Sequence, residues 1–319
     1  MTLFPLSPEP TNTDKQLLEL INKYPQFNPI YLNVHMRDDW KLVKEFFDKE
    51  WIDFKKFADD NFYNEFQKNY SQRAWEIYLF YLFHSKGFSF AVQKKNQSNP
   101  DLKILLDNRF LFVEAVTAGK GTGVNSVETL SDLLSKAWPE KMVSRGGHID
   151  DSNHPKVRRI LSALDEKIRN YKKHQRIIAK NDFYMIAISG AEIEGSMMGD
   201  EIILEALTGI NPALHIPLMK DGKLGHGFKT VRKAISNSKG SAQIDLGVFN
   251  YEAANEISAV LYFGSDTFNS ILQQKSGEAV VIHNPNVIEN KRINPDLLSD
   301  FRQIIILPTE YKYLRPRQR

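Results

Sequence analysis

Hydrophobic and aromatic positions recur every three to four residues along most of the first seventy residues. Because residues three and four apart share one face of a helix, this spacing predicts amphipathic helices over 14–24 and 38–70. The first dozen residues contain three prolines and are expected to form a poorly ordered arm. Residues 1–70 are therefore predicted to be an N-terminal arm and a helical cap that packs on a larger body.

The pattern then changes from helical to strand-like spacing. Residues 71–88 are apolar on nearly all sides up to Lys86 and Gly87, which predicts a helix buried over most of its surface. Shorter runs with alternating or continuous hydrophobicity follow, and they predict strands. The predicted strands are 88–93, 102–106, 110–116 and 183–189, and the predicted helices among them are 126–138 and 154–175. The order helix, three strands, helix, strand indicates an α/β fold.

The pattern is looser after residue 190. Residues 194–218 read as a helix and a loop, and residues 221–230 have the glycine-rich composition of turns. Two more strands are predicted over 256–263 and 278–287. Neither brings enough neighbouring structure to build a core of its own, so both are expected to extend the same sheet. The predicted division is 1–70, a core over 71–190, and a C-terminal extension over 191–319 that packs on this core.

Composition excludes several classes of protein. The 319 residues carry a formal net charge of +3, so the chain is no global polycation, although residues 156–180 and the C-terminal 311–319 are locally basic. The absence of cysteine excludes disulfides, Cys-ligated zinc and a cysteine nucleophile, and it suits a cytoplasmic protein. No apolar run approaches the ~18 residues that span a bilayer, and the N-terminus lacks a signal-peptide pattern. We expect a cytoplasmic protein that does not associate with membranes.

Two acidic residues lie in the predicted hairpin. Asp101 follows Pro100 directly before one strand, and Glu114 lies in the next strand with twelve residues between the two acids. A hairpin places such positions side by side. Two neighbouring carboxylates repel each other unless one is protonated or a cation lies between them, and Mg²⁺ is a common solution, with Mn²⁺ as a substitute. The pair therefore points to metal-assisted hydrolysis of phosphodiesters.

A third acid, Glu76, lies on the buried helix between Trp75 and Ile77. An unpaired charge is costly there. Glu76 either joins the same metal site or faces outward and pairs with Arg73. A further alternative for the hairpin acids is that they merely pair with Lys103 or Arg109.

The segments RAWEIYLFYLFHSKGFSF, NPDLKI and FLFVEAV, within roughly 71–189, resemble the core of the PD-(D/E)XK nuclease superfamily. This resemblance implies a restriction-endonuclease-like αβββαβ core with a mixed central sheet. It also implies that Asp101 and Glu114 are metal-binding acids, that Glu76 is an accessory acid, and that the carbonyl of Ala115 is a metal ligand.

One position departs from this pattern. Where the family has a lysine that orients or activates the attacking water, this chain has Val116, which can do neither. Three lysines are candidates for the missing group. Lys103 shares a strand face with Asp101, Lys120 lies in the glycine-rich loop after the third strand, and Lys167 lies on the later helix.

The later helix carries further candidates. Lys167 and Tyr171 are four residues apart on one face, and they resemble the Q-x-x-x-Y element of many relatives with lysine in place of glutamine. The alternative is that Tyr171 belongs to an apolar stripe and packs in the core. Lys156 and Arg158 are expected to meet a phosphate backbone, together with the basic C-terminus, which predicts salt-sensitive binding of nucleic acid.

Other motifs give weaker indications of function. His215 and His283 are lone histidines in apolar surroundings and are expected to be structural, and the GKGTG of 119–123 is too short for a P-loop. The sequence therefore predicts a Mg²⁺-dependent endonuclease, acting on DNA in restriction, phage defence or repair. The alternative is an inactive nuclease-fold module for nucleic-acid binding or assembly. A homodimer is possible in either case.

Overall fold

The computed structural model describes residues 2–5, 13–93, 99–121, 126–127, 129, 131–132, 154–193, 200–210, 231–236, 243–264, 267–272, 279–307 and 311–314. Within these ranges, eight strands form one sheet in the order β1-β2-β3-β4-β7-β8-β9-β10, and β5 and β6 form a separate ribbon. The strands are β1 Ser89–Phe90, β2 Leu102–Leu106, β3 Arg109–Thr117, β4 Phe183–Ser189, β5 Ala234–Ser236, β6 Gln243–Asp245, β7 Ala259–Phe263, β8 Val280–His283, β9 Arg302–Ile306 and β10 Tyr311–Leu314.

The large sheet is mixed. The pairs β3–β4, β4–β7 and β8–β9 are parallel, and the other neighbouring pairs are antiparallel. The three central strands β3, β4 and β7 thus run in one direction. Their carboxyl ends meet at one edge, to which the antiparallel β2 contributes its amino end.

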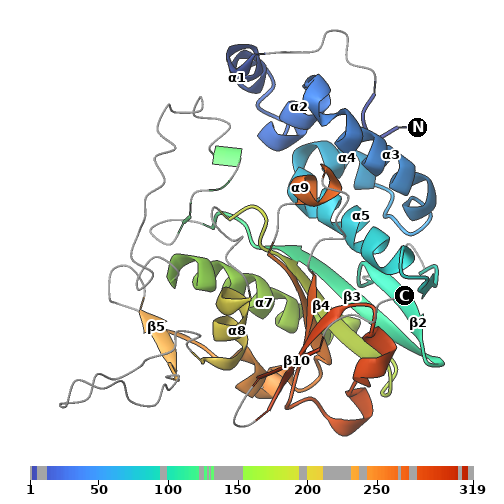
Figure 1. Ribbon diagram of the computed structural model, residues 1–319, viewed down its shortest axis with the longest axis vertical. Helices are drawn as coiled ribbons and strands as arrows, with labels where there is room; N and C mark the ends of the chain where they lie inside the picture. Colours follow the sequence, from blue (N-terminus) through green and yellow to red (C-terminus); the bar gives the residue numbers. More distant parts are fainter. Residues whose placement is uncertain are drawn as a thin grey trace.

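Helices cover both faces of this sheet (Figure 1). The N-terminal helices and α5 pack on one face, and α7 and α8 pack on the other. The α-helices are α1 Asp14–Lys23, α2 Pro29–Met36, α3 Lys41–Phe54, α4 Phe62–Lys68, α5 Tyr70–His84, α7 His154–His174, α8 Glu201–Thr208 and α9 Thr267–Leu272. Short 3₁₀ turns cover Asp38–Trp40, Val248–Asn250, Glu252–Ala254, Glu289–Lys291 and Pro295–Leu298.

Strand β4 shows why the sheet is buried on both sides. Successive strand residues point to opposite faces. Met185 and Ala187 accordingly join the core under α5, whereas Ile186 and Ile188 join the core under α7. A strand covered on both faces has no polar alternation, which explains the continuous apolar sequence of this segment.

The core under α5 is rich in aromatic side chains. Trp75 of α5 stacks on Phe263 of β7, with 5.5 Å between the ring centroids. Its indole Nε1 donates a hydrogen bond of 3.0 Å to the carbonyl oxygen of Ala187, so the one polar atom of this ring is satisfied. This packing fixes α5 against the centre of the sheet.

The hairpin of β2 and β3 turns through Asp107 and Asn108, whose φ angles are 49° and 60°. Two consecutive residues with positive φ are typical of the type I′ turn, the favoured two-residue hairpin loop. The ladder ends with Leu102 paired to Val113. One step further along this register, Asp101 lies opposite Glu114.

Most of the expected elements are confirmed. The chain is an α/β protein with a mixed central sheet, α5, α7, β2, β3 and β4 lie where they were predicted, and the later strands β7 and β8 join the same sheet. The strand expected over 88–93 is only the two-residue β1. The helix expected over 126–138 lies largely outside the described residues, as do 194–199 and 211–230.

Several elements were not predicted from the sequence: α2, α9, the ribbon of β5 and β6, and the strands β9 and β10. Among the helices that the structure describes, none is long and apolar enough to cross a bilayer. One sheet contains strands from both 71–190 and 191–319. The predicted division of the chain into 1–70, 71–190 and 191–319 stays a prediction.

Candidate functional site

Three acids converge where the hairpin meets α5. Glu76 comes from the middle of α5, Asp101 directly precedes β2, and Glu114 lies in β3. The carboxylate Oδ2 of Asp101 accepts a hydrogen bond of 2.7 Å from the backbone N–H of Ala115, the residue after Glu114. This bond holds Asp101 against β3.

Asp101 interacts electrostatically with the other two acids. Burial raises the pKa of the Asp101 carboxyl well above its ordinary value, and the negative charges of Glu76 and Glu114 raise it further. Lys167 and the N–H of Ala115 act in the opposite direction but do not outweigh these effects. Asp101 therefore feels the negative charges of both Glu76 and Glu114, and the predicted role of these acids as metal ligands stays a prediction.

Glu114 lies on the α7 side of the sheet and is only 6 % exposed. The Nζ of Lys167 lies 2.8 Å from its Oε1, and the Nε2 of His174 lies 3.5 Å from its Oε2. Burial alone would raise the pKa of Glu114, but the contacts with His174 and Lys167 outweigh it and lower the pKa. The Oε2 atom is buried and makes no hydrogen bond of normal geometry with the described residues. Both oxygens of Glu114 thus face a basic side chain, Lys167 at Oε1 and His174 at Oε2, and this environment favours the ionised carboxylate.

Glu76 lies on the α5 side and is 4 % exposed. The Arg73 guanidinium approaches its Oε2 to 3.0 Å, and Nε2 of Gln72 donates to its Oε1 at 3.0 Å. Burial nevertheless dominates and raises the pKa of Glu76. Of the alternative in which Glu76 faces outward and pairs with Arg73, the pairing is present, but the side chain is buried. Arg73 is shared, because its NH1 also lies 3.0 Å from Oδ2 of Asp59.

Gln72 links α5 to β3 and was not predicted from the sequence. Its Nε2 also donates to the carbonyl oxygen of Ala115 at 3.2 Å, and its Oε1 accepts from the N–H of Thr117 at 3.0 Å. The signal was present, because Gln72 precedes Glu76 by four residues and shares its helix face. The Ala115 carbonyl retains a second lone pair, so this bond does not by itself exclude another ligand.

Of the three lysines considered for the role that Val116 cannot play, only Lys167 contacts an acid of the site among the described residues. Lys103 does share a face with Glu114, but its Nζ lies 3.9 Å from the ring centroid of Phe110 instead. Lys120 pairs with Asp132. Val116 itself lies in the core under α7. The expected pairing of the hairpin acids with Lys103 or Arg109 is not seen among the ion pairs of the described residues.

The rest of the α7 surface differs from the expectation. Tyr171 is buried, its Oη donates to Glu256 Oε2 at 2.9 Å, and it accepts from Nζ of Lys291 at 2.8 Å. The core-packing alternative therefore describes Tyr171. Arg158 is 5 % exposed and Lys156 is half-buried. Burial leaves Arg158 little surface to offer a phosphate backbone, and its contact with nucleic acid stays a prediction.

Of the two lone histidines, His283 lies among the described residues. His283 is buried, and its Nε2 lies 2.7 Å from Oε1 of Gln303. Burial lowers the pKa of His283, which keeps the ring neutral and fits the expected structural role. His215 lies outside the described residues.

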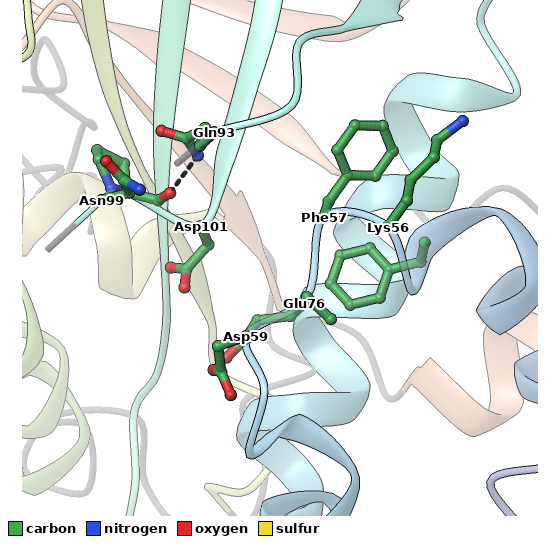
Figure 2. Close-up of a pocket in the computed structure, with 10 residues that line it drawn as sticks. Lys56, Phe57, Asp59, Glu76, Gln93, Asn99 and Asp101 are labelled. Carbon is green, nitrogen blue, oxygen red and sulfur yellow. Dashed lines mark hydrogen bonds between the residues drawn. The ribbon is translucent and has the colours of Figure 1, made fainter. Parts of the chain in front are cut away.

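A cavity of about 120 Å³ opens beside Glu76 and Asp101. Figure 2 shows the carboxylates of Asp59, Glu76 and Asp101 on one side of it, with Phe57 and Lys56 on another. The remaining lining residues are Phe54, Ala58, Gln93, Asn99 and Pro100. The cavity therefore lies between the acids, with Gln93 and Asn99 beside Asp101, and the aromatic side chain of Phe57 (Figure 2).

The oxygen donors of the three acids are the type of ligand that a hard divalent cation prefers. A ready-made arrangement is not present, because no group of three or more acidic or histidine side chains within the described ranges is placed to hold a metal ion. The cations Arg73 and Lys167 occupy part of the space around the acids.

Comparisons with protein-family models, with curated proteins and with solved structures found no match for this chain. The resemblance to the PD-(D/E)XK nucleases therefore stays a prediction from the sequence.

Proposed function

We propose that this protein is a Mg²⁺-dependent endonuclease that hydrolyses phosphodiester bonds in DNA. The observation that carries the proposal is the position of Asp101, which the N–H of Ala115 holds against β3 beside Glu114 and which also lines a cavity with Glu76 of α5. Both neighbouring acids raise the pKa of Asp101. Such an excess of negative charge is what a divalent cation would relieve.

Asp101, Glu114 and the carbonyl of Ala115 would hold the ion, with Glu76 as the accessory acid. When bound, Mg²⁺ would polarise a phosphoryl oxygen and lower the pKa of a water molecule. Lys167 is the group that compensates for Val116. Its Nζ keeps Glu114 ionised and places a positive charge next to the acids, where charge on the phosphate would develop.

A second candidate function is an inactive module with the same fold that binds nucleic acid or a protein partner. Two observations favour it. Gln72 already donates to the Ala115 carbonyl, and Arg73 and Lys167 already neutralise Glu76 and Glu114. In such a protein the chain's own cations would do what the metal does in an enzyme.

The first experiment measures cleavage of single-stranded DNA, double-stranded DNA, modified DNA and RNA with Mg²⁺ or Mn²⁺. The enzyme proposal expects that Asp101→Asn and Glu114→Gln abolish cleavage, whereas Glu19→Gln, at an exposed position on α1, has no effect. Inactivity of the wild-type protein on every substrate would refute the proposal.

Calorimetry with Mg²⁺ separates the two candidates. Binding that disappears in Asp101→Asn supports the enzyme. Binding of nucleic acid without any binding of metal supports the module.

A further inference from the structure

The cavity beside the acids is built from three separated segments. The end of α3 and the loop after it supply Phe54 and Lys56–Asp59, α5 supplies Glu76, and the chain leading into β2 supplies Gln93 and Asn99–Asp101. Glu76 and Asp101 belong to both the cavity and the proposed catalytic site. Whatever fills this cavity therefore lies directly next to the scissile phosphate.

The size of the cavity limits its occupant. An enclosed cavity of about 150 Å³ takes up one benzene ring. The cavity here opens to solvent and has a volume of about 120 Å³, which is more than a single ion or water needs and leaves room for one six-membered ring.

The charges limit the occupant further. Asp59, Glu76 and Asp101 all line the cavity, so a phosphate group is repelled from its interior. Arg73 already neutralises two of these acids, Asp59 and Glu76, so an organic cation would gain little electrostatic attraction from the cavity. A neutral ring with polar edges meets both conditions.

The uncharged wall suits such a ring. Phe57 is half-buried and is held by Phe80 and Phe90, whose ring centroids lie 5.6 Å and 5.5 Å from its own. The amide of Gln93 is fixed by a hydrogen bond of 2.6 Å from its Nε2 to the carbonyl of Pro100. Side-chain amides such as those of Gln93 and Asn99 offer both donors and acceptors, as the edge of a nucleobase requires.

A cation lies beyond the aromatic side of the cavity (Figure 2). Lys56 is exposed, and its Nζ lies 5.0 Å from the ring centroid of Phe57. A phosphate excluded from the interior can therefore meet a positive charge next to the aromatic wall. The aromatic ring of Phe57 and the amide of Gln93 suit the base of one nucleotide, and the ammonium of Lys56 suits its phosphate.

The geometry points to this cavity as the binding pocket for one unstacked pyrimidine base of a DNA strand, next to the phosphate that Asp101 and Glu114 face. This inference rests on the proposed function for its placement of the strand. A base inside a duplex is stacked and paired and cannot enter such a pocket. The substrate is therefore a single strand, or a duplex from which one base is extruded, and cleavage is favoured beside pyrimidines.

The test measures binding in EDTA, so that it does not depend on catalysis. Fluorescein-labelled (dT)₈ is compared by anisotropy with an octamer of abasic tetrahydrofuran residues, which keeps the phosphates and lacks every base. Stacking and edge contacts to one base predict that the wild-type protein binds (dT)₈ roughly tenfold more tightly. Gln93→Ala and Phe57→Leu are expected to remove this difference without changing affinity for the abasic strand, whereas Glu19→Gln keeps it.

Each result decides between the hypotheses. Equal affinity for the two strands in the wild-type protein overturns the pocket, even if the protein cleaves DNA with Mn²⁺. A base-dependent difference that Gln93→Ala removes supports the pocket, even if no strand is cleaved, and in that case only the nuclease proposal fails. If Phe57→Leu does not fold, Gln93→Ala alone decides. Free thymidine monophosphate that binds as tightly as (dT)₈ would show a nucleotide site and refute binding of a strand.

Discussion

Glu76 and Glu114 lie on opposite faces of the same sheet, and each is a buried glutamate beside a cation, yet their pKa values move in opposite directions. Burial raises the pKa of Glu76 despite Arg73, whereas His174 and Lys167 overcome burial and lower the pKa of Glu114. The difference shows that burial alone does not set the ionisation of these acids. The arrangement of their partners does.

The cations beside the two glutamates, Arg73 and Lys167, differ in the contacts that they make. Arg73 divides its guanidinium between Glu76 and Asp59, and the Asp59 side chain is 52 % exposed. Lys167 directs its ammonium at Glu114 from a site that is only 16 % exposed. Asp101 lies between the two regions and feels both negative charges. A cation added to this site would therefore meet one acid whose pKa is lowered, Glu114, and two acids whose pKa is raised, Glu76 and Asp101.

The largest expected effect comes from Lys167→Met. This substitution keeps the length of the side chain and leaves Glu114 buried with its charge uncompensated on one oxygen. Removal of one partner of a buried pair typically costs about 3 kcal/mol or more of unfolding free energy. Urea unfolding at pH 7 measures it, with Lys172→Met, on the exposed side of α7, as the control.

A double-mutant cycle sharpens this result. If the cost comes from the stranded charge, Lys167→Met combined with Glu114→Gln loses less stability than the sum of the two single substitutions. Simple additivity would show that Lys167 stabilises the fold through packing alone.

Arg73→Met is expected to cost less, about 2 kcal/mol at pH 8, because Glu76 can take up a proton when its partner is lost. Its raised pKa makes this protonation easier than for Glu114. The loss should shrink as the pH is lowered towards 5. Chemical unfolding across this range tests the comparison, with Arg169→Met at an exposed ion pair as the control. A cost equal to that of Lys167→Met at every pH would contradict the distinction between the two faces.

Glu76 and Glu114 should also differ in how their contributions to the unfolding free energy depend on pH. Each contribution should change by about 1.5 kcal/mol, the typical value of a hydrogen bond to a charged group. The pKa of Glu114 in the folded protein is below its ordinary value of 4.5, so its contribution is complete above pH 4.5 and is lost as the pH falls through the folded pKa. The pKa of Glu76 is above 4.5, so its contribution is complete below pH 4.5 and is lost as the pH rises through the folded pKa.

Unfolding free energies of Glu114→Gln and Glu76→Gln, each measured against the wild-type protein between pH 3 and pH 8, should therefore diverge in opposite directions. The penalty of Glu114→Gln should be largest at neutral pH and should decrease in acid. Parallel curves for the two variants would mean that the two acids share one environment.

The sequence predicts the local part of this site well. A two-residue turn fixes the register of β2 and β3, so the opposition of Asp101 and Glu114 follows from counting along the chain. The continuous apolar run of 183–189 likewise gives β4 with its bounds. Both features depend on near neighbours, and near neighbours are what a sequence pattern reports.

The partners of the acids are less predictable because they come from distant segments. Strand periodicity puts Lys103 on the face of Glu114, but the rings of Phe110 and Phe112 draw its ammonium away. His174 was missed, although it follows Lys167 by seven residues on the same face of α7. The edge strand β10 was read as a basic tail because it carries Lys312 and precedes a run of arginines, and charged residues on edge strands are common.

The smallest expected effect concerns the turn that sets the register of the acids. Asn108 has a φ of 60°, a left-handed conformation that glycine adopts without strain. Asn108→Gly should stabilise the protein by about 0.5 kcal/mol, since Asp-Gly is a preferred pair in type I′ turns. Asn108→Val should destabilise it by about 1–2 kcal/mol, because a β-branched residue fits this conformation poorly. Thermal unfolding measures both. If the turn fixes how Asp101 faces Glu114, Asn108→Val should also weaken Mg²⁺ binding, and an unchanged affinity would mean that the bond from Ala115 to Asp101 holds the acids together without the turn.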